Sequence, residues 1–313
     1  MIQNKQLEQL LHGLFGPDAN SYIESLLQPK RPGIRLNLLK AEEREILSLL
    51  QESGFRLSPL GFVEAGYRVD YYPVEIGRTP EHLLGLIYVQ NPGSMLPAAL
   101  LRPEPGQRVL DVAAAPGSKT TQLCTMMRNT GLIVANDPDR SRLKALNGNI
   151  DRWGCINTGT ISLDGGKLGR VYPNFFDRVL LDAPCSGLGT LHKNPGITSW
   201  WSFEKVRSFT ALQRRLILSS YDALASGGIM VYSTCTITPQ ENEEVVNHLL
   251  QQRPDAQLLP ISLPGVQLEP GFGPDGFSKL HPDLVKTARL YPWRNPGAEA
   301  FYLALIRKPH ISS

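Results

Sequence analysis

The sequence DRVLLDAPCSG at residues 177–187 decides the fold, and a second stretch, GIMVYSTCT at residues 228–236, ends in the same way. In each stretch an apolar run stops abruptly at small and polar residues, as parallel strands do where they open into a site. Ligands of open α/β sheets bind outside the carboxyl ends of the strands. We therefore expect the two strands to bring Cys185 and Cys235 to one rim of a sheet, beside the bound ligand.

From residue 106 onward, strands and helices are expected to alternate. We expect strands at 108–113, 131–136, 157–162, 177–182 and 228–234, and helices at about 118–128, 139–152, 204–225 and 239–252. Repeated units of this length indicate an α/β fold with a doubly wound, mostly parallel sheet. The apolar segment 299–306 is expected to add an antiparallel last strand. The Pro- and Gly-rich segment 260–298 is expected to be a surface loop that contacts substrate or covers a sheet edge.

Residues 1–75 are expected to form a small N-terminal α+β domain. Leucines at helical spacing come first, followed by a strand at 34–38, a helix at 41–53 and further strand within 55–69. This RRM-like β-α-β pattern fits either an RNA-binding domain or a cover over one edge of the main domain. A connecting helical segment, 76–105, leads into the main catalytic domain over 106–313.

The composition bounds the class of protein. The chain has 313 residues, is 42% hydrophobic and has a net charge of +3, which indicates a globular protein and permits nucleic acid as a partner without requiring it. The four cysteines lack the CxxC and His spacing of zinc sites, so no metal is expected. No signal sequence or membrane span is expected, and free thiols indicate the reducing cytoplasm. Without a heptad or a long apolar stripe, a monomer is expected.

The stretch DVAAAPGSKTT at residues 111–121 follows the first expected strand of the main domain and opens its first helix. Its small residues let the backbone approach a ligand closely, but it matches neither G-x-G-x-x-G nor a phosphate-binding P-loop. A nucleoside cofactor without a pyrophosphate fits better. Asp137, at the end of the next strand, is placed for ribose hydroxyls, and Asp164 for the adenine edge; each is also a candidate N-cap or turn residue.

The motifs at 111–121, 182–187 and 233–236, with Glu241-Asn242-Glu243, resemble the signatures of the Nop/Sun (Fmu-type, RsmB/RsmF-like) RNA cytosine-5 methyltransferases. The similarity runs in the same order from about residue 34 to residue 308 and is closest to the small-subunit rRNA methyltransferase F group. Two features depart from that group. The chain ends at Ser313 without the usual C-terminal extension, and the group's Gly-Phe-Phe is here Ala300-Phe301-Tyr302.

The resemblance implies a Rossmann-like fold that binds S-adenosylmethionine. It also implies a reaction that methylates carbon 5 of an RNA cytosine, with Cys235 as the nucleophile that adds to carbon 6, Asp182 at cytosine N3 and Cys185 in product release. From chemistry alone, either thiol suits the attack. The cofactor residues implied are Ala113, Ala114, Ala115, Pro116, Gly117, Ser118, Lys119, Asp137, Asp164 and Asp182.

The substrate allows several interpretations. Small-subunit (16S) rRNA is the first expectation and tRNA the second; a DNA cytosine-5 methyltransferase, with Cys185 as nucleophile, and a non-catalytic ribosome assembly factor are further alternatives. A target base inside a duplex must be unstacked to reach such a site. Lys193, Arg207 and Arg214 are candidates for phosphate contacts, with Trp200, Trp201 and Phe203 beside them for stacking. These side chains fit a solvated helix face and a packed core equally well.

Overall fold

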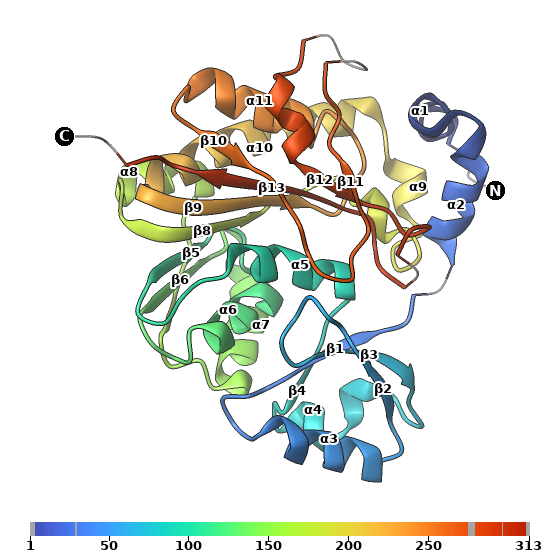
Figure 1. Ribbon diagram of the computed structural model, residues 1–313, viewed down its shortest axis with the longest axis vertical. Helices are drawn as coiled ribbons and strands as arrows, with labels where there is room; N and C mark the ends of the chain where they lie inside the picture. Colours follow the sequence, from blue (N-terminus) through green and yellow to red (C-terminus); the bar gives the residue numbers. More distant parts are fainter. Residues whose placement is uncertain (1–3, 29, 275–278, 296, 311–313) are drawn as a thin grey trace.

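A large mixed sheet forms the main body of the computed structural model, which describes residues 4–28, 30–274, 279–295 and 297–310 (Figure 1). Its strand order is β11-β12-β13-β9-β8-β5-β6-β7, with β10 paired to β13. Five neighbouring strands run parallel, which confirms the predicted Rossmann-like α/β class. They are β5 (Arg108–Asp111), β6 (Leu132–Asn136), β7 (Thr158–Ile161), β8 (Phe176–Asp182) and β9 (Leu224–Thr234).

The remaining strands of this sheet are antiparallel additions. As predicted, β13 (Phe301–Arg307) pairs antiparallel with β9. The expectation of a loop over 260–298 is wrong in part, because β11 (Leu268–Pro270) and β12 (Ala288–Leu290) extend the sheet beyond β13. These strands, like β10 (Gln257–Leu259), have three residues each, too few for alternation to be visible among the prolines and glycines.

Helices cover both faces of the sheet, because its inner strands are apolar on both sides. In β8, Val179 and Leu181 join one core cluster and Leu180 joins the other. On one face lie α5 (Pro92–Leu101), α6 (Ser118–Met126) and α7 (Arg140–Trp153), and on the other α10 (Phe203–Ala223) and α11 (Glu243–Gln252) (Figure 1).

A second, smaller sheet lies below the main body in Figure 1 and has the order β2-β3-β1-β4. Its core, which includes Ile34 and Val69, is covered by the inward side chains of α3 (Glu43–Glu52). The segment 76–105, which we expected to be helical, contains one strand of this sheet. This strand, β4, is apolar and pairs antiparallel with β1. The strands are β1 (Gly33–Leu36), β2 (Arg56–Pro59), β3 (Gly66–Tyr71) and β4 (Ile87–Val89).

The first two helices, α1 (Lys5–Phe15) and α2 (Ala19–Leu27), pack against the main body. Tyr22 of α2 makes an edge contact with Tyr291 at 5.8 Å, in a core that also holds Trp201. The residues before the small sheet therefore belong to a different core from the sheet itself. The limits of the three units expected from the sequence stay a prediction.

The short helix α4 (Pro80–Leu83) is capped by Thr79, whose hydroxyl accepts the His82 backbone N–H. Helix α5 begins at Pro92, because the side chain of Asn91 accepts the Gly93 N–H at 2.9 Å and so caps the helix there.

Candidate active site

The site lies where the strand order reverses. From β5 the chain proceeds to β6 and β7 on one side, and then returns to β8 and β9 on the other. The carboxyl ends of β5 and β8 are therefore the edges of a switch point, where α/β sheets bind ligands. Lys119, after β5, reaches across it to Asp182 at the end of β8, with 2.6 Å between Nζ and Oδ2.

The two cysteines meet at this rim, as the sequence indicated. Cys185 follows β8, Cys235 follows β9, and their sulfur atoms lie 3.3 Å apart. The hydrogen bond between the two sulfurs, together with burial, raises the pKa of Cys185 well above its ordinary value. Cys185 is thus a neutral thiol at pH 7 that can exchange a proton with Cys235.

A buried carboxylate ties the loops of the two cysteines together. Glu241 accepts the Ser186 N–H at 2.8 Å and the hydroxyls of Ser186 and Thr238 at 2.5 Å each. The Ser186 hydroxyl also lies 2.8 Å from that of Thr236, so the residues that follow Cys185 and Cys235 are bonded to each other. The sequence indicated Glu241 only as part of a motif, because residue spacing does not show which groups donate hydrogen bonds to its carboxylate.

Asp182 is held by two partners at the rim. Its Oδ2 accepts from Lys119, and its Oδ1 accepts from the Ser233 hydroxyl at 2.7 Å. Burial works against the Lys119 ammonium, but the attraction and hydrogen bond of Asp182 outweigh it and raise the pKa of Lys119. Asp182 is therefore a fixed hydrogen-bond acceptor between the small-residue turn at 113–117 and the two cysteines.

The small-residue turn after β5 has the shape of a cradle. Gly117 adopts a φ of +105°, and a Cβ there would lie 3.0 Å from the Leu146 side chain, so glycine suits both the backbone and the space. Asp164 keeps 39% of its side chain exposed while its Oδ1 accepts the Gly166 N–H, so the sequence's cap interpretation applies and still leaves carboxylate surface open.

Asp137 differs from the other carboxylates, because only 1% of its side chain is exposed. It accepts the N–H groups of Ala115 and Asp139, and Arg142 covers it with 3.1 Å between Nη1 and Oδ2. In this structure Asp137 holds the turn at 113–117 in place through its hydrogen bond from Ala115. Arg142, which the sequence analysis missed, lies between it and solvent with half of its side chain exposed.

The donor set fits a nucleoside-type methyl donor. The carboxylates of Asp164 and Asp182, at or after the ends of β7 and β8, suit an amino group, and the small residues at 113–117 follow β5 on the same rim. Asp111 adds a buried carboxylate atom, Oδ1, without a hydrogen-bond partner. All of these residues lie at or after the carboxyl ends of parallel strands.

The candidate RNA contacts lie on the loop after Cys185 and on helix α10. Lys193, on the loop after Cys185, pairs with Glu299 at 2.5 Å, and Arg214 of α10 approaches Glu244 at 3.6 Å. Arg207 is exposed on α10. Of the aromatic residues proposed for stacking, Trp200 is 42% exposed, whereas Trp201 is 2% exposed and belongs to the core. Trp201 is thus excluded from base stacking, because the core of α1 and α2 covers it.

Comparisons with known proteins define the class. The family model described as 16S rRNA methyltransferase RsmB/F matches residues 98–307, and that of the N-terminal domain of RsmF matches residues 4–92. The chain therefore belongs to the RsmB/F methyltransferase family, which confirms the resemblance seen in its motifs.

Three relatives show how far the similarity extends. The tRNA (cytosine(49)-C(5))-methyltransferase of Pyrococcus abyssi is 45% identical over 93% of both chains. The ribosomal RNA small subunit methyltransferase F of Pectobacterium carotovorum is 40% identical over 92% of this chain, which spans only 59% of that protein. A solved methyltransferase homolog from Pyrococcus horikoshii superimposes with a TM-score of 0.87 at 34% identity, over 98% of this chain and 96% of that one.

The described residues also bear on two other classes of site. No helix among them is long and apolar enough to cross a membrane. Nor does that part of the chain hold a group of three or more His, Cys, Asp or Glu side chains placed to bind a metal ion. The remaining two cysteines, Cys124 and Cys155, are buried in the core beside α6 and α7.

Proposed function

We propose that this protein transfers a methyl group from S-adenosylmethionine to carbon 5 of a cytosine in RNA, through a covalent bond between Cys235 and the base. The observation that carries the proposal is the 3.3 Å approach of Cys185 and Cys235, beside the carboxylate of Asp182. Family membership supports the reaction class. Two thiols and an acid at one rim suit a reaction that adds a nucleophile and later eliminates it.

The roles follow from the chemistry of cytosine, whose carbon 5 is a poor nucleophile. The Cys235 thiolate adds to carbon 6, and the resulting enamine makes carbon 5 nucleophilic. A proton shared between Asp182 and cytosine N3 holds the base and neutralises the negative charge that develops at N3 when the thiolate adds. The cofactor, when bound, supplies the electrophilic methyl group. After transfer, Cys185 accepts the carbon 5 proton, having first given up its own proton. The electrons of that C–H bond restore the double bond between carbons 5 and 6, and the bond between sulfur and carbon 6 breaks to return Cys235 as a thiolate.

The proposed cofactor site consists of residues at or just after the carboxyl ends of β5, β6, β7 and β8. Lys119 and the turn before it contact the amino-acid part, and Asp164 accepts from the adenine amino group. Asp137 is proposed for the ribose hydroxyls, for which Arg142 must move aside. The full set is Ala113, Ala114, Ala115, Pro116, Gly117, Ser118, Lys119, Asp137, Asp164 and Asp182.

Small-subunit rRNA is the proposed substrate, because both matching family models and the methyltransferase F relatives are described by that RNA. A tRNA is the second candidate, since the Pyrococcus abyssi enzyme, named for a tRNA cytosine, matches over 93% of both chains. We further propose that the protein acts in the cytoplasm as a monomer without a metal ion. A stable dimer in light scattering would contradict the monomer.

The test is to incubate the wild type, Cys235→Ala and Cys185→Ala with S-adenosylmethionine and either 16S rRNA or tRNA. The measured quantities are 5-methylcytosine and the protein–RNA adduct that survives denaturation. Cys235→Ala should abolish both, whereas Cys185→Ala should accumulate adduct. The RNA that reacts identifies the substrate. Methylation by Cys235→Ala would assign the attack to another group, as in the DNA-methyltransferase alternative, and a wild type silent on both RNAs would favour the assembly factor.

A further inference from the structure

A buried arginine of the small sheet forms hydrogen bonds with the first turn of helix α6. Arg35, on β1, is 3% exposed, and its guanidinium lies about 5 Å from the ring centroids of both Tyr88 and Trp153. Its Nη2 donates to the Ser118 carbonyl oxygen and to the Thr121 hydroxyl, at 2.8 Å each. The small sheet therefore holds the first turn of α6, where Lys119 also lies.

The same arginine begins a second route to Lys119. Arg35 Nε donates to Gln90 Oε1 at 2.7 Å, and Gln90 Nε2 donates to the Ser94 carbonyl oxygen at 2.9 Å. The Ser94 hydroxyl, at the start of α5, in turn accepts from Lys119 Nζ at 3.1 Å. Together with the hydrogen bond from Arg35 to Ser118, the residue before Lys119, these contacts form a closed ring of which Lys119 is a member.

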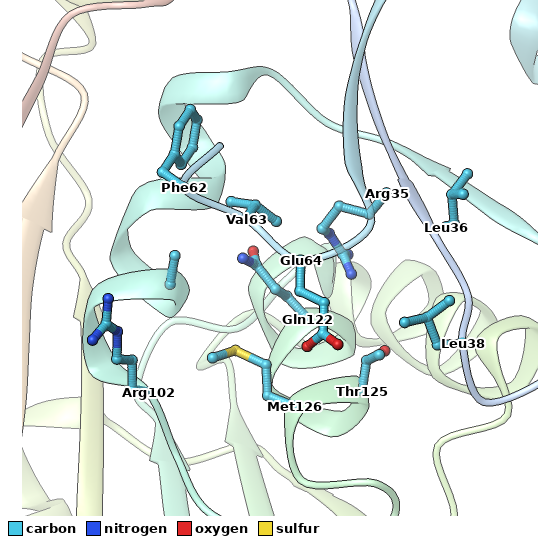
Figure 2. Close-up of a pocket in the computed structure, with 11 residues that line it drawn as sticks. Arg35, Leu36, Leu38, Phe62, Val63, Glu64, Arg102, Gln122, Thr125 and Met126 are labelled. Atoms are coloured by element: carbon cyan, nitrogen blue, oxygen red, sulfur yellow. The ribbon is translucent and has the colours of Figure 1, made fainter. Parts of the chain in front are cut away.

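Hydrogen bonds, more than close packing, fix this ring. A cavity of about 290 Å³ adjoins Arg35 between the small sheet and helices α5 and α6, and Glu64, Gln122 and Thr125 also line it (Figure 2). On that side the arginine has space beside it (Figure 2). Directional contacts to Gln90 and Ser118 are then what hold the guanidinium in place.

The ring acts on Lys119, a flexible side chain of the site. A lysine ammonium has three donors on a four-carbon stem, so one acceptor alone leaves it free to swing. Lys119 uses Asp182 and Ser94 as its acceptors, and it lies close enough to Cys235 for their charges to interact. Removal of Ser94 Oγ would take away one of these two acceptors and leave only the contact between the ammonium and Asp182.

We propose that Ser94 and Gln90, held in place by Arg35, are positioning residues that fix the Lys119 ammonium against Asp182 and near Cys235. The small N-terminal sheet then sets the geometry of the cofactor and cysteine site, in addition to any contact with RNA. This inference rests on the proposed function, in which Lys119 contacts the cofactor and Cys235 is the attacking thiol.

The test is Ser94→Ala in the full chain, studied without turnover. Affinity for S-adenosylhomocysteine, measured by calorimetry, should fall roughly tenfold, the cost of one hydrogen bond to a charged group. The rate at which iodoacetamide alkylates Cys235 at pH 7 should fall severalfold, because the ammonium no longer stays near the sulfur. The thermal midpoint should stay within a few degrees of wild type, since alanine suits a helix.

Two further variants separate positioning from general damage. Ser94→Thr restores a hydroxyl and should recover both the affinity and the alkylation rate. Ser141→Ala makes the same change on α7, where the hydroxyl contacts Asp139, and should leave both quantities as in wild type. A Ser94→Ala protein with wild-type affinity and alkylation rate would overturn the proposal.

The outcome is distinguishable from a failure of the proposed function. If the wild type does not bind S-adenosylhomocysteine, the cofactor assignment fails, and the alkylation rate of Cys235 alone then decides the positioning role. If the wild type binds the nucleoside but methylates no RNA, both measurements on Ser94→Ala still apply unchanged.

Discussion

The sulfur atoms of Cys185 and Cys235 lie 3.3 Å apart at the ends of two adjacent strands. Mild oxidation should therefore join them, with two thiols oxidised and an added diamide reduced to its hydrazine form. We expect mass spectrometry of the non-reduced digest to show one disulfide between these residues and loss of alkylation at both. Cys124 and Cys155 also contact each other, but both are buried, so they should stay reduced while the protein is folded. Persistence of two alkylatable thiols at 185 and 235 would contradict this geometry.

Glu241 should be needed for the folded state as well as for the site. Glu241→Ala leaves the buried Ser186 N–H and two hydroxyls without their acceptor, which we expect to cost about 2–4 kcal/mol of unfolding free energy. Urea unfolding measures this loss. The matched variant Glu244→Ala removes a half-exposed carboxylate next to α10 and should cost under about 1 kcal/mol. Equal losses in the two variants would show that Glu241 has no special function.

Asp111 should make stability depend on pH. Burial raises its pKa from 3.8 to about 7, against the opposing effects of Thr120 and Lys119. The folded protein keeps a proton that the unfolded chain releases, so this stabilisation is complete below about pH 4 and is lost as the pH rises through about 7. Relative to Asp111→Asn, the wild type should lose up to about 4 kcal/mol between pH 4 and pH 8. Parallel stability curves for the two proteins would be the contrary result.

The buried pair of Arg289 and Glu243 should be strongly coupled. The two side chains are 2% and 0% exposed and share two hydrogen bonds, at 2.7 and 2.5 Å. Arg289→Met leaves a buried carboxylate unpaired and should cost about 3–5 kcal/mol in chemical denaturation. Adding Glu243→Gln to that variant should recover part of the loss, because the unpaired charge is gone. Strictly additive losses would mean that the two residues do not interact.

Contacts with RNA should differ between two arginines of α10. Arg207 is exposed, so Arg207→Ala should weaken RNA binding and lower the slope of log affinity against log salt by about one. Arg214→Ala should have the smaller effect, since Glu244 already approaches that side chain. Arg307→Ala is the control, because Arg307 ends β13 and pairs with Ile229, whereas Tyr302, near the start of β13, pairs with Thr234 beside Cys235. A salt slope unchanged in Arg207→Ala would remove this residue from the interface.

The sequence carried the information for the sheet and for the meeting of the cysteines. The apolar runs at 179–181 and 229–232, which stop at Asp182 and Ser233, mark parallel strands, and the position of the strand ends follows from the fold class. Short strands such as β12 have no such signal, because their pairing depends on β13, which lies later in the chain. The contents of 260–298 could therefore be seen only in three dimensions.

The polar framework of the site was equally hidden. The bonds from Glu241 to Ser186 and from Lys119 to Ser94 join residues that are far apart in the chain, and spacing says nothing about them. Arg142, in the first turn of α7, was hidden as well, because it donates to the carbonyl oxygen of Ala115, 27 positions earlier, while it covers Asp137. Sequence patterns locate groups on elements, whereas hydrogen bonds between elements depend on angstrom-scale packing.

The docking of α1 and α2 has a consequence for the order of events during synthesis. Leu11 and Tyr22 lie in one core with Leu191 and Tyr291, which the ribosome adds much later. The small sheet between residues 33 and 89 has its own core and can close early. The two leading helices must wait, with their apolar faces uncovered, until most of the chain is made. We expect a nascent chain stalled before Tyr291 to expose these helices to chaperones and proteases, and the finished chain to withdraw them.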